Sequence, residues 1–321
     1  SNITQRPLNL SGSRAYDSTR TASGSYLSFT NIVSGETLWL TGSGVLDSPA
    51  AGSRTIVNTN TLAISDGSGI ATNYTLTNGT LTMTIVPRST TVSGTKTYDG
   101  TTNVSSSNLT SFSNLAGSDT LSLSGTGTIS SADVGTGKTV NTSGLTIDNS
   151  SGVGSNYTLS AATVNVTERV IGLSGVRAFD GTNNASSADL SISNLVSGEN
   201  LTLSGSGTVP NATVEMNKAI TLGSLSISDG SGGKSSNYTL TGGSHTLDIS
   251  QLSVNVTGSR QYDGTKTVDS SDLTLTNLVS GETVSLTGAG TVADENVGAN
   301  KTVSAGSLAL TGPGAGNYTL S

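Results

Sequence analysis

The sequence predicts an all-β chain built from four tandem copies of one small domain. Apolar residues alternate with Ser, Thr and Asn through most of the chain, which is the period of a half-buried strand. No segment carries the 3.6-residue apolar stripe that an amphipathic helix requires. We therefore expect small antiparallel β-sandwich-like (Ig-like) units that together form an extended rod. β-grasp-like units or a β-solenoid are the alternatives, and a solenoid would need several coils in each copy.

Two independent sequence markers repeat at nearly the same interval. The tetrapeptide Asn-Tyr-Thr-Leu begins at four positions that are 83, 81 and 80 residues apart: Asn73, Asn156, Asn237 and Asn317. An aromatic-Asp pair, followed by Gly in three of its four copies, has spacings of 82, 81 and 83 residues: Tyr16-Asp17-Ser18, Tyr98-Asp99-Gly100, Phe179-Asp180-Gly181 and Tyr262-Asp263-Gly264. Markers that agree in this way identify internal repetition rather than biased composition.

These intervals divide the chain into repeat 1 (residues 1–86), repeat 2 (87–168), repeat 3 (169–250) and repeat 4 (251–321). The last strand of one repeat leads almost directly into the first strand of the next, as at Ile85-Val86-Pro87, with no flexible Gly/Ser or Pro-rich spacer. Adjacent repeats are therefore expected to touch, which limits bending at each junction. Repeat 4 stops at Ser321 before the end of its last strand, so we expect the natural protein to continue.

Five apolar segments recur in each repeat, and we expect each of them to form a strand. In repeat 1 they are residues 8–10, a segment that ends at Phe29 and Ile32, residues 38–40, Leu62 with Ile64, and a segment that runs from Asn-Tyr-Thr-Leu to Met83 and Ile85. A glycine aligned in all four copies follows the first segment: Gly12, Gly94, Gly175 and Gly258. The Val, Ile, Thr and Tyr content suits a pleated surface, and the intervening Gly, Ser and Asn residues are typical of turns.

The composition of the 321 residues argues against several classes of function. There is no Cys, so the chain holds neither disulfides nor thiolate metal ligands. A net charge of −7 and a pI near 4.6 make nucleic acid a poor partner, because binding to a phosphate backbone requires a basic surface. No segment approaches the ~20 apolar residues of a membrane-spanning helix, so we expect no membrane insertion of this segment.

Charged residues recur in register with the strands. A basic residue lies three positions before each Asp of the aromatic-Asp marker, at Arg14, Lys96, Arg177 and Arg260. Acidic residues align in a turn at Glu36, Asp119, Glu199 and Glu282, and a second basic set aligns at Arg54, Lys138, Lys218 and Lys301. We expect one or more repeated ion pairs that hold loops. Because Arg replaces Lys in both basic sets, an intramolecular isopeptide bond common to all repeats is excluded.

The aromatic-Asp-Gly marker is typical of a turn that follows a strand. Asp accepts local backbone hydrogen bonds and Gly tolerates a positive φ, while Ser18 indicates that repeat 1 does not strictly need a positive φ here. We expect the aromatic ring to plug the core beneath the turn, and Phe179 indicates that the hydroxyl is dispensable in repeat 3. Calcium binding by these Asp residues is the alternative, but no Asp-x-Asp-x-Asp run is present.

No repeated constellation of residues suggests catalysis. The only histidine, His245, occurs in one repeat, so no His-based acid–base pair is repeated. We therefore predict no catalytic residues, no cofactor-binding residues, no metal ligands and no cofactor. Asn-x-Ser/Thr sequons are frequent, which leaves glycosylation open. The Thr-rich stretch at residues 80–84 is expected to be the solvent face of a strand rather than an ice-binding ladder.

In these features the chain resembles the YDG-type repeats of filamentous-haemagglutinin-like bacterial surface adhesins, which are two-partner-secreted exoproteins. The resemblance rests on Tyr/Phe-Asp-Gly, on Asn-Leu-x-x-Gly-Glu at Asn194 and its counterparts, on Leu-x-Leu-Ser/Thr-Gly-x-Gly, on Asn-Tyr-Thr-Leu, and on the seam at Gln5-Arg6-Pro7-Leu8. Ser18 and Phe179 depart from the first motif. The resemblance covers nearly the whole chain and implies a secreted protein held at the bacterial cell surface. It supplies no catalytic residues.

These observations favour a non-enzymatic structural role. We expect a stalk or spacer segment of a large secreted adhesin, which projects a binding region and supports cell adhesion or biofilm formation. The expected partners are neighbouring repeats of the same chain, with host or bacterial glycans, or like repeats on other cells, as further candidates. The alternative is that the repeats themselves bind glycans or self-associate into a filament or sheath. Trp39 has no aromatic counterpart in the other repeats, which favours the spacer.

Overall fold

The computed structural model describes residues 1–321, and the prediction of an all-β chain is confirmed. The chain forms two compact units, Ser1–Thr167 and Glu168–Ser321, each of which holds two repeats. Every helical segment is a single 3₁₀ turn of three residues, and the remaining regular structure is strand. No helix has the length and apolar character that crossing a lipid bilayer requires.

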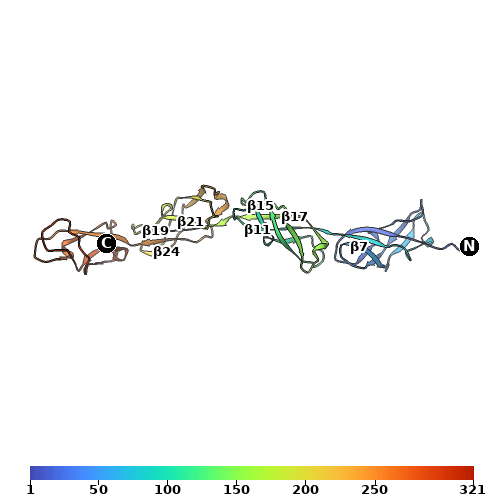
Figure 1. The fold of residues 1–321 in the computed structure, drawn as a ribbon, viewed down its shortest axis with the longest axis horizontal. Coiled ribbons are helices and arrows are strands. Elements are labelled where there is room, and N and C mark those ends of the chain that lie inside the picture. Colours follow the sequence, from blue (N-terminus) through green and yellow to red (C-terminus); the bar gives the residue numbers. More distant parts are fainter. The chain divides into compact units, whose positions relative to one another are not determined.

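The first unit contains seventeen of the strands (Figure 1). In repeat 1 the elements are β1 (Arg6–Pro7), β2 (Leu10–Ala15), β3 (Thr21–Ser23), η1 (Gly24–Tyr26), β4 (Leu27–Phe29), β5 (Leu38–Thr41), β6 (Ser43–Leu46), β7 (Gly52–Asn58), β8 (Ala63–Asp66), η2 (Ala71–Asn73), β9 (Tyr74–Thr75) and β10 (Thr82–Val86). In repeat 2 they are β11 (Arg88–Thr97), β12 (Asn103–Ser105), η3 (Ser106–Asn108), β13 (Leu109–Ser113), β14 (Leu121–Thr128), β15 (Gly135–Thr139), β16 (Leu145–Asn149), η4 (Gly154–Asn156) and β17 (Tyr157–Thr167).

The second unit follows the same order of elements. In repeat 3 they are β18 (Arg169–Val170), β19 (Gly172–Ala178), β20 (Asn184–Ser186), η5 (Ser187–Asp189), β21 (Leu190–Ser193), β22 (Leu201–Ser204), β23 (Ser206–Thr208), β24 (Glu215–Ala219), β25 (Ser226–Asp229), η6 (Ser235–Asn237), β26 (Tyr238–Thr239) and β27 (His245–Ser250). In repeat 4 they are β28 (Leu252–Gly258), β29 (Thr267–Asp269), η7 (Ser270–Asp272), β30 (Leu273–Thr276), β31 (Ser285–Thr287), β32 (Ala289–Thr291), β33 (Ala309–Thr311), η8 (Ala315–Asn317) and β34 (Tyr318–Leu320).

A mixed sheet organises each repeat, and repeat 2 shows it most completely. Its strand order is β13-β11-β17-β15, and Figure 1 places β11, β15 and β17 together in the green part of the chain. The first strand, β11, runs parallel to the last strand, β17, from Arg88↔Tyr157 to Thr97↔Thr167. Strands β13 and β15 flank this pair in antiparallel orientation. Repeat 3 has the same order, β21-β19-β27-β24, with β19 parallel to β27.

The expectation of purely antiparallel sheets is therefore wrong for the central pair of strands. Alternation of apolar and polar residues is the same in parallel and antiparallel strands, so it carries no information on direction. Parallel neighbours need a long connection, and here the connection consists of nearly the whole repeat. The other sheets are small. Most of them are antiparallel, for example β5 with β8, β22 with β25, and β31 with β33, whereas β1 with β9 and β18 with β26 are parallel.

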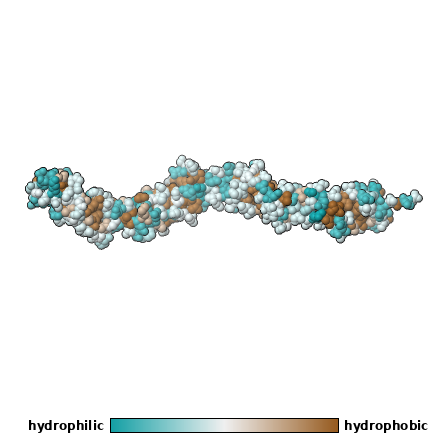
Figure 2. All heavy atoms as spheres, turned by 60° about the horizontal axis from the view of Figure 1, so that its bottom comes forward, coloured by the Kyte–Doolittle hydropathy of each residue, from teal (hydrophilic) through white to brown (hydrophobic).

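The inserted last strand supplies the centre of the core because its apolar residues point to one side. In β10, Met83 and Ile85 are at most 1% exposed, and their neighbours face outward. Val164 and Val166 of β17, and Leu247 and Ile249 of β27, occupy the same positions. In repeat 1 this strand packs with Leu10, Leu46 and Ile56, among others, in one cluster. On the face shown in Figure 2, hydrophobic residues form separate patches, and hydrophilic residues and residues of intermediate hydropathy lie between them.

The aligned glycine of the first strand is required by close contact with the next strand. A Cβ at Gly175 would lie 1.9 Å from the carbonyl oxygen of Asp189, and the same clash would occur at Gly12, Gly94 and Gly258. The obstacle is backbone in each case, so a side chain could be accommodated only by moving a strand apart from its neighbour.

We predict that Gly175→Ala lowers the free energy of unfolding by about 1–3 kcal/mol, because the added methyl forces β19 away from the backbone at Asp189. The control is Gly316→Ala, where a Cβ meets nothing within 4 Å. Urea denaturation of both variants measures the difference. Equal stability of the two variants would contradict this account of the aligned glycine.

Candidate functional site: the junctions between repeats

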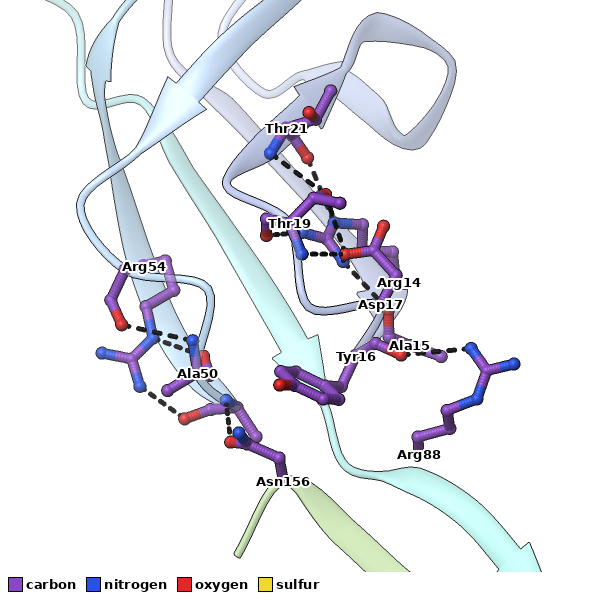
Figure 3. A network of polar contacts seen from close by, with 12 residues as sticks. Arg14, Ala15, Tyr16, Asp17, Thr19, Thr21, Ala50, Arg54, Arg88 and Asn156 are labelled. Carbon is purple, nitrogen blue, oxygen red and sulfur yellow. Dashed lines mark hydrogen bonds and ion pairs between the residues drawn. The ribbon is translucent and has the colours of Figure 1, made fainter. Parts of the chain in front are cut away.

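The aromatic-Asp-Gly motif begins with a turn that its Asp holds closed. Asp17 accepts hydrogen bonds from the backbone N–H and the hydroxyl of Thr19, both at 2.8 Å, and forms an ion pair with Arg14 at 2.5 Å (Figure 3). Arg14 is buried, and its guanidinium also donates to the carbonyls of Ala15, Thr19 and Thr21. One buried cation therefore binds three carbonyl groups of the turn and of the strand ends beside it.

The same ion pair forms in every repeat, as predicted. Its members are Lys96–Asp99, Arg177–Asp180 and Arg260–Asp263 in the other three copies. Burial acts to raise the pKa of Asp99, but the hydrogen bonds from Lys96 and Thr101 outweigh it and lower the pKa below its usual value. Each of these carboxylates is thus engaged by its own loop, which is a structural role.

Ser18 has a positive φ of 68°, so the expectation that repeat 1 does not need this conformation is wrong. The glycines at the same position, Gly100, Gly181 and Gly264, have φ between 75° and 77°. A non-glycine residue in the left-handed region is strained because its Cβ approaches the following carbonyl. The turn imposes this conformation on whichever residue occupies the position.

The aromatic ring of the motif was expected to plug the core of its own repeat. In repeats 1 and 3 it also packs against the next repeat, and in repeat 4 the expectation is wrong because Tyr262 is 65% exposed. The rings of Tyr16 and Tyr157 meet edge to face, with centroids 5.4 Å apart and planes at 75°. Both tyrosines, together with Ala116 of repeat 2, belong to the core cluster of repeat 1. Tyr157 is the tyrosine of the second Asn-Tyr-Thr-Leu, so the two repeated markers of the sequence contact each other.

Asp119 connects these two tyrosines through hydrogen bonds. Its Oδ2 accepts from the hydroxyl of Tyr16 at 3.1 Å and from that of Tyr157 at 2.6 Å. The Tyr157 hydroxyl also accepts from the backbone N–H of Ala116 at 3.0 Å. Burial raises the pKa of Tyr157 to about 12, and the hydrogen bond to Asp119 acts in the same direction. The hydroxyl of Tyr16 therefore has a partner in Asp119 of repeat 2, whereas Phe179 has no hydroxyl.

The asparagine of Asn-Tyr-Thr-Leu also reaches the neighbouring repeat. Oδ1 of Asn156 accepts from the backbone N–H of Ala51 at 2.8 Å, and Asn156 is 3% exposed (Figure 3). Arg54 holds the loop that presents this N–H, since it donates to the carbonyls of Ala50 and Ala51. The loop and the asparagine together add a second contact to the junction.

The second unit contains the same junction between repeats 3 and 4. The rings of Phe179 and Tyr318 meet edge to face at 5.4 Å and 78°. Oδ1 of Asn317 accepts from the backbone N–H of Val214 at 3.1 Å, in the loop equivalent to that of Ala51. Two ring contacts and two asparagine bonds, formed by aligned residues, identify a repeated junction rather than an accidental contact.

The aligned turn acids do not pair with the second basic set. Glu36, Asp119 and Glu199 accept instead from the tyrosine of Asn-Tyr-Thr-Leu in their own repeat, and the Tyr238–Glu199 bond measures 2.7 Å. The second basic set braces the loop that precedes its own strand: Lys138 donates to the carbonyl of Ser131, Lys218 pairs with Glu215, and Lys301 pairs with Asp294. Both sets hold loops, as expected, but with different partners.

The asparagine of the Asn-Leu-x-x-Gly turn ties that turn to the first strand. Nδ2 of Asn114 donates to the carbonyl of Ser89 at 2.7 Å, and Asn31, Asn194 and Asn277 make the equivalent bond to Pro7, Val170 and Ser253. The two residues that have no counterpart in the other repeats, Trp39 and His245, take no part in the junctions described above. Trp39 is 65% exposed on β5, and Nε2 of His245 lies 2.8 Å from the carbonyl oxygen of Leu240.

A family model described as the YDG domain matches the chain four times, at residues 3–84, 80–165, 167–246 and 249–321. The chain therefore belongs to the YDG domain family and consists of four such repeats. No curated protein matches the sequence. The aromatic-Asp-Gly motif forms a turn in every repeat, and in repeats 1 and 3 its ring contacts the next repeat.

We predict that Ser18→Gly raises the free energy of unfolding by up to about 1 kcal/mol, because glycine adopts a positive φ without strain. The control is Ser28→Gly in β4, an exposed strand position, where loss of the side chain should destabilise by about 0.5–1 kcal/mol. Thermal denaturation of both variants measures the opposite signs. A destabilised Ser18→Gly variant would contradict the inferred strain.

We predict that Tyr157→Phe lowers the free energy of unfolding of the first unit by about 1–2 kcal/mol, because Asp119 loses a donor and the buried N–H of Ala116 loses its acceptor. Tyr26→Phe, at a side chain that is 54% exposed, is the control. The folded-state pKa of Tyr157 is about 12 against an ordinary 10.0, so its contribution is complete below pH 10 and is lost as pH rises towards 12. The stability of the Tyr157→Phe variant should therefore fall less steeply between pH 10 and pH 12 than that of the wild-type chain. A variant with the same pH dependence of stability as the wild type would contradict this role of Tyr157.

Proposed function

We propose that this chain is a non-enzymatic stalk or spacer segment of a large secreted bacterial surface adhesin, which projects a binding region and supports cell adhesion or biofilm formation. The proposal rests on where the two repeated sequence markers lie in the structure. In both units the residues of the aromatic-Asp-Gly motif and of Asn-Tyr-Thr-Leu contact each other across a junction. Residues that join copies of a domain serve to build length.

The covalent connection between repeats supports a stiff spacer. Strand β10 ends at Val86 and β11 begins at Arg88, so a single residue, Pro87, lies between them. The backbone N–H of Tyr16 donates to the carbonyl of Val86 at 2.9 Å, and Arg88 donates both to the carbonyl of Tyr16 in repeat 1 and to that of Asn114 in repeat 2. A hinge motion at this seam would break these bonds together with the ring contact.

We also propose that the sheets of each repeat enclose its core as two layers, in the manner of a small β-sandwich. In repeat 1 the mixed sheet contributes Leu10 and Met83 to the core, and the short sheet of β5 and β8 adds Leu40, which packs against the same cluster. A core supplied by two separate sheets is what this architecture requires.

The adhesin context rests on the resemblance of the repeats and their seam to filamentous-haemagglutinin-like exoproteins, and location at the bacterial cell surface follows from the same resemblance. The composition suits such a role, because a Ser-, Thr- and Asn-rich surface with 11% charged residues stays solvated without a strong field. Enzymatic activity is not part of the proposal, since the repeated polar groups form turns and junctions.

Binding of glycans by every repeat is the less favoured alternative. A sugar site commonly presents exposed aromatic rings, and Trp39, the most exposed aromatic side chain of repeat 1, has Ser122, Thr202 and Ser285 at the equivalent positions. Self-association of the repeats into a filament or sheath is the second candidate.

We predict that small-angle scattering of the chain gives the dimensions of an extended particle, and that a chelator does not change them, because the junctions use hydrogen bonds and ring contacts. The paired variant Tyr16→Ala/Tyr157→Ala should broaden the distance distribution, since it removes the ring contact at one junction. Tyr26→Ala, at an exposed ring, is the control.

A compact particle would overturn the spacer proposal, and collapse on chelation would show that metal ions hold the junctions. Binding of the intact chain to an array of bacterial and host glycans would favour the alternative.

A further inference from the structure

In both units a tight turn of the later repeat lies against the aromatic-Asp-Gly motif of the earlier one. The turn comprises residues 116–119 in repeat 2 and 279–282 in repeat 4, and a backbone hydrogen bond from its last residue to its first closes it, at 3.0 Å and 3.2 Å. The N–H groups of Ala116 and Val279 both donate to the tyrosine hydroxyl of Asn-Tyr-Thr-Leu in their own repeat, at 3.0 Å and 3.1 Å. Ala116 and Val279 therefore occupy the same position in the two turns.

In the second unit the glycine of the motif lies directly against the valine of the facing turn. A Cβ at Gly181 would lie 2.6 Å from Cγ1 of Val279 and 3.8 Å from its Cβ. Gly181 belongs to repeat 3 and Val279 to repeat 4, so this contact crosses the junction. A side chain at residue 181 would have to displace the valine, because two carbon atoms cannot approach to 2.6 Å. The valine therefore requires a residue without a side chain opposite it.

In the first unit the sizes of the facing residues are reversed. Ser18 stands where repeat 3 has Gly181, and Ala116, which has no γ carbon, stands where repeat 4 has Val279. The next residue of the turn is Gly117, and a Cβ there would lie 2.9 Å from Oγ of Ser18. A side chain added on the side of repeat 1 is thus matched by smaller residues at two successive positions of repeat 2.

The backbone of the turn in repeat 2 differs as well as its side chains. Its positive φ is at the second residue of the turn, Gly117, with a value of 55°. In the other repeats the second residue is serine, and the positive φ, between 86° and 89°, is at the third residue: Gly35, Gly198 and Gly281. The altered turn places its glycine beside the hydroxyl of Ser18, where a side chain would not fit.

We propose that the residue after the Asp of the aromatic-Asp-Gly motif and the first two residues of the facing turn form a steric match that determines which repeat can follow which. A repeat with serine after this Asp, as at Ser18, accepts a repeat whose turn begins Ala-Gly. A repeat with glycine there, as at Gly181, accepts a repeat whose turn begins with valine. Serine against valine overpacks the contact, and glycine against alanine leaves a cavity, so both mismatches destabilise the junction.

This match supplies the selectivity that the other junction contacts lack. The edge-to-face ring contact and the asparagine hydrogen bond are the same in both units, so neither can distinguish one neighbouring repeat from another. Tandem domains of similar sequence misassemble when a domain pairs with the wrong copy. A contact that fits only one type of neighbour disfavours such pairings. The inference goes beyond the stalk role, because it depends only on the contacts within the two junctions.

Hydrogen exchange of the full chain, resolved to single amides, tests the proposal. The N–H of Ala51, bonded to Asn156, reports opening of the first junction. Ala116→Val should speed its exchange about fivefold or more, because the added methyl groups meet Ser18. Ala161→Val, at an exposed position of β17, is the matched control and should leave this exchange unchanged.

The double variant Ser18→Gly/Ala116→Val restores the combination of the second unit and should recover most of the protection at Ala51. Relief of backbone strain at Ser18 acts equally whichever residue is at position 116. Only a steric match makes the effect of Ser18→Gly larger with valine at position 116 than with alanine.

The second unit provides an independent cycle of variants. The N–H of Val214, bonded to Asn317, reports opening of its junction. Gly181→Ser should speed this exchange more than Gly198→Ser does, because Gly198 has a similar positive φ but a Cβ there meets nothing within 4 Å. Adding Val279→Ala to Gly181→Ser should give a smaller loss of protection than the two single losses combined.

The proposal is overturned if Ala116→Val exchanges like Ala161→Val, or if Ser18→Gly has the same effect with alanine and with valine at position 116. Equal effects of Gly181→Ser and Gly198→Ser on the amide of Val214 overturn it as well, and this comparison holds even if a variant of the first unit does not fold.

Discussion

The insertion of the last strand of each repeat beside the first is the constraint on which the remaining structure depends. In repeat 2, β17 lies between β11 and β15 and places Val164 and Val166 in the core, so the domain closes only when its two ends meet. In repeat 1, the inserted strand β10 continues through Pro87 into β11, and the turn at Tyr16 is bonded to its last residue. Closure of one repeat therefore positions the start of the next, and burial of apolar surface supplies the driving force for both.

The junction explains why several motifs repeat together. Tyr16 reaches Asp119 and Tyr157, Asn156 reaches Ala51, and Arg54 holds the loop that contains Ala51. The second unit reproduces the contact with Phe179 in place of a tyrosine, so the ring contact does not depend on the hydroxyl. The hydroxyl of Tyr16 adds a bond to an acid that Tyr157 also uses, and this bond has no equivalent from Phe179. In the junctions of both units the motif thus makes the same ring contact, to which only Tyr16 adds a hydrogen bond from its hydroxyl to the turn acid.

Local patterns in the sequence predicted the strands well where one face is buried. Met83 with Ile85 and Leu38 with Leu40 lie in strands as expected, and the pairing of Arg14 with Asp17 follows from their spacing within one turn. Strands β3 and β7 were not anticipated, because Thr21–Ser23 and Gly52–Asn58 hold few apolar residues and pair largely through their backbones. The positive φ of Ser18 was also missed, since the conformation belongs to the turn and not to the residue.

The sequence alone determined the number of repeats, the all-β class and most of the strand positions, because side-chain alternation and turn residues act over a few neighbouring positions. It also predicted the ion pair within each motif for the same reason. Only the tertiary structure decided the parallel direction of the central strands and the partners of the aromatic rings that recur in the repeats. Tyr16 and Asp119 are 103 residues apart, and no local pattern encodes a contact at that separation. Such contacts depend on how the closed repeats stack, which is set by the burial of apolar surface they share.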